Sequence, residues 1–250
     1  MKGTSAVFKT TVITVCLALY TLAGAAAQGV EPPRGRFYGM VERIERIEYS
    51  ERAPIRAAYD WGRLAATRWL VGFGLEPDAF WYGGGVAGLG VNEVHSGEGE
   101  TVDYDAVFLG LEGAYRRSLT RMPGAGFRAT ARFLIALPDD GEITDVARDS
   151  VTDGARAELS WNELTLGVAA LLDYDAMRFE TGLEYCSRDI SQKWTFPDAS
   201  RNTSRSTLTP DRDLGVRLGV ALLISEGVEA RLGMTVGHQT AFRGGVQVFF

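Results

Sequence analysis

The sequence has few cysteines, few histidines and, beyond its first segment, no long apolar run. Its 250 residues include two cysteines and two histidines, which are too few for a disulfide-stapled fold and do not have the spacing of zinc ligands. Acidic residues outnumber basic ones by 32 to 26, whereas proteins that bind nucleic acids carry a basic surface. We therefore expect no nucleic-acid partner, no metal and no cofactor.

Glycine, by contrast, is abundant. The chain has 30 glycines and only 8 prolines, against about 7% glycine in average usage. The glycines follow no Gly-X-Y period, and 46% of the residues are hydrophobic while 23% are charged. The excess therefore belongs neither to collagen nor to a disordered linker.

The first 27 residues have the pattern of a secretory signal peptide. Lys2 and Lys9 flank the start of an apolar run at residues 12–22, and small residues follow it. The run is shorter than the roughly 20 apolar residues that a transmembrane helix needs, and the small residues favour cleavage. We therefore predict cleavage between Ala27 and Gln28.

The remaining chain, residues 28–250, is predicted to form one exported domain. It would keep a single cysteine, Cys186, so an internal disulfide is impossible. No later apolar stretch reaches the roughly 18 residues of a transmembrane helix. The exported domain must therefore be held together by its core or by its sheet.

Apolar and polar residues alternate along most of this domain. Within 213–224, Leu218 and Val220 belong to an apolar face, and Arg217 and Gly219 belong to the opposite face. Successive side chains of a strand point to opposite faces, so the pattern predicts strands with one apolar face. Eight such strands are regular: 66–75, 104–116, 127–137, 163–174, 176–187, 213–224, 228–238 and 242–250.

Three segments are less regular. Residues 36–48 alternate only as far as Val41, after which charges fill both faces. Residues 79–91 contain the pattern G-x-G-x-x-G at 83–88, but strand periodicity continues through it and no helix pattern follows, so we predict a strand and not a dinucleotide loop. Residues 155–174 change phase near Asn162, which predicts a β-bulge.

The connections between these strands alternate between short and long. This alternation is typical of an up-and-down barrel in an outer membrane, which has tight periplasmic turns and longer external loops. We predict an all-β transmembrane barrel of about ten strands, with eight and twelve as alternatives, and with both ends of the domain on the periplasmic side. A soluble periplasmic β-sandwich or lipocalin-like binding protein also has one apolar face per strand, and it remains the alternative fold.

Three patterns favour the barrel over the sandwich. The apolar faces of the regular strands hold no charge in their central residues. Glycines recur on the polar faces, where they relieve crowding inside a closing barrel: Gly167, Gly182, Gly215, Gly219, Gly233, Gly237 and Gly245. Aromatic residues lie next to the predicted short turns, as in an interfacial girdle: Phe73, Trp81, Tyr115, Phe127, Tyr174, Phe179 and Phe250.

The last strand ends in an aromatic residue. Phe242, Val246, Val248 and Phe250 form its apolar face, and this segment resembles the C-terminal strand of bacterial outer-membrane β-barrels, although Val248 stands where tyrosine is often found. The resemblance implies the outer membrane of a Gram-negative envelope, contact with outer-membrane lipids and recognition of these four residues by the barrel assembly machinery. We expect a monomer.

The polar faces predict an interior rich in charge. Nine charged residues are the candidate lumen residues: Glu112, Arg128, Arg132, Arg178, Glu180, Glu184, Arg217, Glu229 and Arg231. Arg68, Arg116 and Arg243 are expected on the same face. A ten-stranded barrel lies near the filled end of the size range, so we expect a mostly filled lumen in a structural or surface-binding protein. The alternative is a narrow porin-like channel for small polar or anionic solutes.

Other chemistry has weaker support in the sequence. His95 is predicted in a loop, and His238 is predicted as an interfacial polar residue near an external strand end, without an acid partner, so we expect no enzyme. The predicted loop 138–154 is rich in aspartate and glutamate, and the predicted loop 187–212 is rich in arginine. The first has the oxygen ligands of a calcium site without its spacing, and we expect both to be solvated polar loops.

Overall fold

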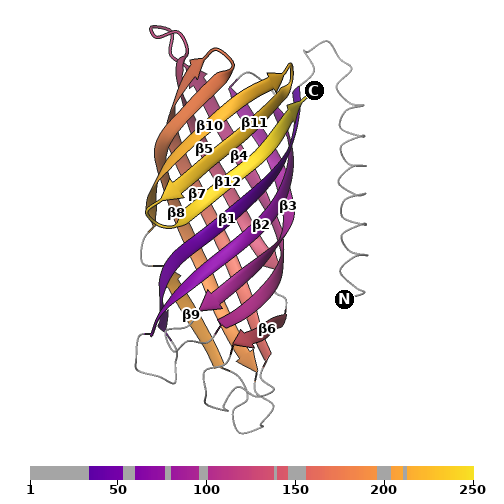
Figure 1. Ribbon diagram of the computed structural model, residues 1–250, viewed down its shortest axis with the longest axis vertical. Coiled ribbons are helices and arrows are strands. Elements are labelled where there is room, and N and C mark those ends of the chain that lie inside the picture. Colours follow the sequence, from indigo (N-terminus) through magenta and orange to yellow (C-terminus); the bar gives the residue numbers. More distant parts are fainter. Residues whose placement is uncertain are drawn as a thin grey trace. The chain divides into compact units, whose positions relative to one another are not determined.

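The computed structural model describes residues 34–52, 60–76, 80–95, 101–137, 140–145, 156–195, 204–210 and 213–250. The unit Gly35–Phe250 is a closed antiparallel barrel, and within the described ranges it contains no helix, hence none that could span a membrane (Figure 1). Its strands are β1 (Arg34–Arg52), β2 (Asp60–Glu76), β3 (Trp81–His95), β4 (Thr101–Ser118), β5 (Ala125–Leu137), β6 (Asp140–Asp145), β7 (Arg156–Tyr174), β8 (Met177–Thr195), β9 (Ser204–Pro210), β10 (Leu214–Ser225), β11 (Val228–Val236) and β12 (Thr240–Phe249).

The barrel closes where the last strand meets the first. β12 pairs with β1 from Arg36 opposite Phe249 to Arg46 opposite Thr240. The backbone N–H of Gly35 donates to the carbonyl oxygen of Phe250 at 2.7 Å, so the barrel begins and ends at the same rim. Short turns connect β4 to β5, β7 to β8 and β10 to β11, and Figure 1 shows them at this rim. The closed sheet confirms the predicted barrel and contradicts the sandwich.

Ten strands make the wall because two of the twelve segments are continuations. β8 pairs first with β10, with Tyr185 opposite Leu214, and then with β9, with Ile190 opposite Leu208. β10 and β9 are therefore one strand with a short interruption, and β5 and β6 share β4 and β7 as neighbours in the same way. The prediction of ten strands is confirmed.

The wall does not keep ten strands along its full height. β11 and β12 end well before their neighbours. Beyond their ends β9, the continuation of β10, pairs directly with β1, with Tyr49 opposite Pro210. In that part β1–β4 and β6–β9 form an eight-stranded wall, which is the lower part of the barrel in Figure 1. The tip of the β11–β12 hairpin, Gly237–Gln239, lies at the fork between β1 and the β9–β10 strand.

The outer surface of the ten-stranded half is apolar. Leu111, Val168 and Leu232 are 61–69% exposed, and such a band is stable only against hydrocarbon. Aromatic rings follow the short-turn rim, where Tyr115 lies 4.7 Å from Trp81 and 5.8 Å from Phe127 between ring centroids. The predicted apolar outer face is confirmed, and the ring contacts give the girdle that the sequence predicts.

The eight-stranded half has the opposite polarity. Its outward side chains include Glu48 and Asp105, which are exposed, and its inward side chains include Ile47 and Leu64, which are at most 1% exposed. Each strand therefore carries apolar residues outward in the ten-stranded half and inward in the eight-stranded half. This arrangement is expected for a barrel that leaves the membrane, because its outside then meets water.

The change of the apolar face from outward to inward explains the phase change near Asn162. The predicted β-bulge is wrong. β7 pairs with β8 without a register shift from Arg156 opposite Thr195 to Tyr174 opposite Met177. Leu164 points outward and is exposed, whereas Trp161 points inward and is buried. The backbone alternation continues unchanged, and only the apolar side of the strand is exchanged.

Several predicted loops are strands. β8 continues to Thr195 and β9 occupies Ser204–Pro210, so most of the predicted loop 187–212 is barrel wall. His95, predicted in a loop, is the last residue of β3, and β6 occupies 140–145 of the predicted acidic loop 138–154. The other residues of that loop and the predicted cleavage point at Ala27 and Gln28 lie outside the described residues.

The lumen as the candidate functional site

The inner face of the barrel carries three layers of side chains. A vestibule lies toward the short-turn rim, a layer of ion pairs lies in the middle, and an apolar core fills the eight-stranded half. Alternation along the strands turns all nine candidate lumen residues inward. The structure places eight of them in the wall of one cavity: Glu112, Arg128, Arg132, Arg178, Glu180, Glu184, Arg217 and Arg231. Glu229 lies between this cavity and the rim.

The middle layer, called the ion layer below, consists of Glu42, Arg68, Arg132, Glu163, Glu184, Arg188 and Arg243. Its carboxylates are shared between guanidinium groups. Glu163 lies 3.4 Å from both Arg68 and Arg132, and the Nε of Arg188 donates to it at 3.2 Å. Each side chain of the layer is at most 12% exposed. Charges at this depth are stable only when they are paired.

Arg243 joins the two ends of the ion layer. Its Nε donates to Glu42 at 2.5 Å, and its Nη1 and Nη2 donate to Glu184 at 2.9 and 3.1 Å. Glu42 lies on β1, Glu184 on β8 and Arg243 on β12, so one arginine of the last strand connects segments far apart in the sequence. The ion layer is therefore a continuous network of ion pairs across the lumen.

An apolar core covers the ion layer on the side of the eight-stranded half. The guanidinium of Arg68 lies 4.4 Å from the ring centroid of Trp161 and 4.7 Å from that of Phe108, which stabilises its charge through cation–π contact. Beyond these rings the lumen is filled by buried side chains from the surrounding strands: Ile44, Ile47, Tyr49, Leu64, Val94, Tyr104, Leu159, Ile190 and Leu208.

The vestibule is a cavity of about 140 Å³ on the other side of the ion layer. Glu112 accepts hydrogen bonds from the hydroxyls of Tyr38, at 2.7 Å, and Tyr82, at 2.5 Å. Arg36 stacks on the ring of Tyr82, 3.5 Å from its centroid, and lies 3.7 Å from the carboxylate of Glu112. Arg36 also lies 3.8 Å from Glu76, so it pairs with two carboxylates, and the two phenols hold that of Glu112 in place.

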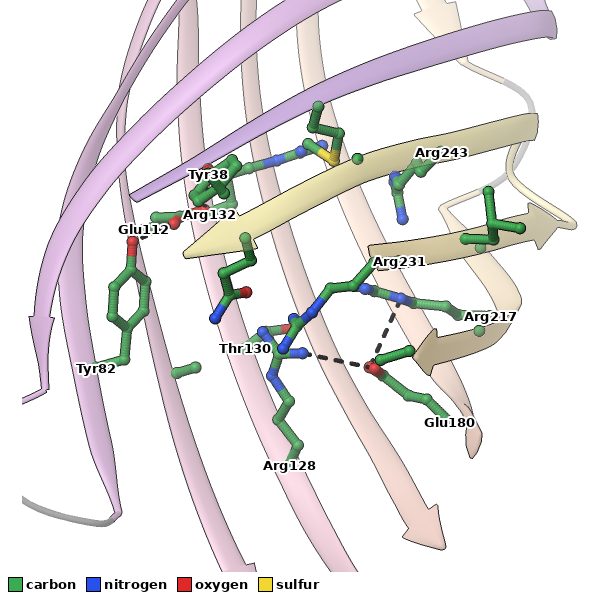
Figure 2. A pocket seen from close by; sticks show the side chains of 18 of the residues that line it. Tyr38, Tyr82, Glu112, Arg128, Thr130, Arg132, Glu180, Arg217, Arg231 and Arg243 are labelled. Atoms are coloured by element: carbon green, nitrogen blue, oxygen red, sulfur yellow. Dashed lines mark hydrogen bonds and ion pairs between the residues drawn. The ribbon is translucent and has the colours of Figure 1, made fainter. Parts of the chain in front are cut away.

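Two arginines share one carboxylate in the vestibule, and a third lies beside them. Figure 2 shows Arg128 and Arg217, from two strands, joined to Glu180, with Arg231 from a third strand next to them. Arg128 lies 3.5 Å from Glu180, and Arg217 lies 3.7 Å from it. Closer to the rim, Arg231 donates to Glu229 at 2.8 Å.

A second group of ion pairs forms the rim itself. Arg116 donates to Asp173 at 2.8 Å, and the Nε of Arg178 donates to the same carboxylate at 2.6 Å. These side chains are more exposed than those of the ion layer, with Arg116 and Asp173 36–37% exposed. The vestibule therefore opens toward the short-turn rim, whereas its other end is closed.

The sequence missed several members of this site. Glu42 lies where charges fill both faces, and Glu163 lies beside the change of phase, so alternation did not assign them to the lumen. Arg188 was assigned to a loop but is buried in β8. Arg36 and Gln247 carried no signal beyond their inward positions.

The histidines differ from the prediction as well. His238 is not an interfacial residue but is buried at the tip of the β11–β12 hairpin, with Nε2 3.4 Å from Glu184. His95 lies 3.0 Å from the hydroxyl of Thr101 at the outer end of β3. Among the described residues no group of three histidine, cysteine or acidic side chains is arranged to hold a metal.

Solved bacterial outer-membrane proteins have a similar fold. The outer membrane protein OprG from Pseudomonas aeruginosa superimposes with a TM-score of 0.53 at 11% identity, over 87% of this chain and 96% of OprG. The translocator domain of the autotransporter NalP from Neisseria meningitidis gives a TM-score of 0.46 at 11% identity, over 96% and 98% of the two chains. No family model and no curated protein matches the sequence.

The fold and its surface define the class. A closed antiparallel barrel with an apolar, aromatic-rimmed outer band and a charged interior is a bacterial outer-membrane β-barrel. Barrels of this class have short periplasmic turns, so we expect the short-turn rim at the periplasmic end and the eight-stranded half toward the cell exterior.

Proposed function

We propose that this protein is a non-conducting barrel with a structural or surface-binding role in the outer membrane. The observation that carries the proposal is that the ion layer and the apolar core close the lumen beyond the vestibule. The eight-stranded half then forms a rigid extension of the barrel wall outside the membrane. Its polar outer face and apolar inner face suit a surface for contacts outside the cell.

A continuous pore fits the interior less well. Conduction needs a hydrated path with weak sites along it, but Trp161, Phe108 and Arg68 are at most 1% exposed between the vestibule and the exterior. Opening a path would separate buried ion pairs, each of which is costly to break. The vestibule is therefore a dead end and not the mouth of a channel.

Catalysis also lacks support in the interior. His238 is 3% exposed and lies on the far side of the ion layer from the vestibule, so a substrate entering from the periplasm would not reach it. His95 has a threonine and a glutamate nearby on the outer surface. Neither histidine is joined to a nucleophile in a pocket, so we propose a binding or structural protein and not an enzyme.

Planar bilayers test the proposal directly. The detergent-folded protein, inserted at a density confirmed by heat-modifiable gel mobility, is expected to give no discrete conductance steps. A general porin reconstituted in the same lipid serves as the positive control. Reproducible steps from the purified protein, abolished by a blocking antibody or by heating before insertion, would contradict a sealed lumen and support the narrow channel.

The C-terminal strand is arranged as the assembly prediction requires. Phe242, Val246 and Val248 on β12, and Phe250 directly after its last residue, are 36–70% exposed. A factor that grips this strand from the lipid side would therefore meet four apolar side chains in one row. Recognition by the barrel assembly machinery and the monomeric state stay predictions.

A further inference from the structure

We propose that the periplasmic vestibule is a binding site for a small oxyanion of the phosphate class, either free or as the terminal phosphate of a small molecule. The ligand would enter from the periplasmic rim and bind among Arg36, Arg128, Arg217 and Arg231. The proposal needs the barrel and its vestibule, but it does not depend on whether the barrel conducts.

The first argument is the balance of charge. Seven arginines and three glutamates line the cavity. Arg132 and Arg243 belong to the ion layer, and Arg178 pairs with Asp173 at the rim. The other four arginines each lie within 4 Å of a carboxylate: Arg36 of Glu76 and Glu112, Arg128 of Glu180, Arg217 of Glu180 and Glu184, and Arg231 of Glu229. Glu180 is shared between Arg128 and Arg217, and Glu229 between Arg231 and Arg178.

The second argument is independent of charge and concerns buried donors. The Nε of Arg36 and the Nε2 of Gln247 are both shielded from solvent, and neither makes a hydrogen bond. Arg36 is 7% exposed and Gln247 is 2% exposed, and both line the cavity. A buried donor without a partner costs about 1–3 kcal/mol. An anion in the vestibule would provide the missing acceptors.

The third argument is the fit between these donors and phosphate. A guanidinium presents a planar fork of N–H groups that matches two phosphate oxygens, and charge-assisted bonds of this kind are the strong ones. Three such forks from different strands surround the space beside Glu180 (Figure 2). A cavity of about 140 Å³ admits a phosphate group with a few waters but not a polymer.

A glycine in the cavity wall provides a sharp test. A Cβ atom built on Gly219 would lie 3.4 Å from the carbonyl oxygen of Leu232 and 3.6 Å from the Cβ of Glu180, which are ordinary contacts. Gly219→Asp therefore places a carboxylate beside the arginines without a backbone clash. Gly219→Asn has the same shape without the charge and is the matched control.

The experiment measures binding of inorganic phosphate to the full protein folded in a neutral detergent. Isothermal calorimetry is run in chloride buffer at constant ionic strength, and thermal unfolding is followed in parallel. We expect saturable binding of phosphate that raises the unfolding temperature. Gly219→Asp should abolish binding and unfold at a higher temperature than Gly219→Asn in phosphate-free buffer, whereas Gly219→Asn should bind within about threefold of the original protein.

Two arginine variants, one inside the vestibule and one on the outer face, test where phosphate binds. Arg128→Gln should weaken phosphate binding by at least about tenfold, the effect of losing one charge-assisted contact. Arg43→Gln should bind normally, because Arg43 is 43% exposed on the outer face, where it pairs with Glu93. Heat-modifiable gel mobility establishes that each variant is folded. If either Gly219→Asp or Arg128→Gln fails to fold, the other variant still tests the proposal.

The source of the phosphate is resolved in a second arm. Vesicles of phosphatidylcholine with and without phosphatidic acid are compared as hosts for the protein. If phosphatidic acid removes the binding of added phosphate, the lipid headgroup occupies the vestibule, and if binding is unchanged the ligand is a soluble phosphate. Absence of saturable binding in both hosts and in detergent, or equal binding by Gly219→Asp and Gly219→Asn, would overturn the proposal.

Discussion

Replacing Glu163 by glutamine is expected to destabilise the folded barrel by about 3–5 kcal/mol, the cost of removing one partner from a buried ion pair. Glutamine keeps the shape of the side chain but not its charge. Glu163 lies within 3.4 Å of Arg68, Arg132 and Arg188, and the side chains of Arg68 and Arg188 have no exposed surface. Their charges would then be left with fewer carboxylates in a layer that excludes water.

Glu158→Gln is the matched control for this variant. Glu158 lies on the same strand, pairs with Lys193 at 3.1 Å, and is 42% exposed. An exposed ion pair contributes about 0–1 kcal/mol, so the control should unfold almost as the original protein does. Urea titration of protein folded in vesicles measures both. A loss below about 1 kcal/mol for Glu163→Gln would mean that water solvates the ion layer, and the sealed lumen would then be wrong.

Leu218→Arg is expected to lower the free energy of unfolding by about 2–4 kcal/mol, the penalty for a charge on the lipid face near the middle of the bilayer. Leu218 is exposed on the outer face at the centre of β10. Leu222 lies on the same face and strand, four residues closer to the periplasmic turn. Arginine there can reach the headgroups, so Leu222→Arg should cost about 0–1 kcal/mol.

The difference in destabilisation between Leu218→Arg and Leu222→Arg tests whether this face contacts lipid. Both positions are leucines on one face of one strand, and in a soluble barrel or sandwich they would share an environment. A depth-dependent cost, measured by the same urea titration in vesicles, is specific to lipid. Equal costs at Leu218 and Leu222 would contradict the membrane assignment of this face.

Most of the ten-stranded half could be predicted from the sequence because its pattern is complete. Each strand shows an apolar face, and the short turns fix the neighbours, so the count, the lipid face and the inward direction of residues such as Arg217 follow. The distances between inward charges do not follow, because they depend on the stagger of strands around the barrel. That Arg128 and Arg217 meet at Glu180 could not be read from their spacing.

The eight-stranded half was misread for a different physical reason. Alternation shows that the two faces of a strand differ, but it does not show which face meets solvent. Outside the membrane the apolar side turns inward, so Trp161 and Leu164 on one continuous strand point in opposite directions. Without the membrane boundary, the change of phase resembles a bulge, and strand residues such as Arg188 resemble a loop.

The most direct test of the central claim is a measurement of the surroundings of single residues. Cysteine is introduced singly at Leu232, Asp189 and Leu208 in a Cys186→Ala background, and each is labelled with a nitroxide in vesicles. Collision with oxygen reports lipid, and collision with a soluble nickel chelate reports water. We expect the label at 232 to respond to oxygen, the label at 189 to nickel and the label at 208 to neither, because these positions face lipid, water and the core. Nickel access at 232 together with oxygen access at 208 would contradict a barrel that exchanges its apolar face at the membrane surface.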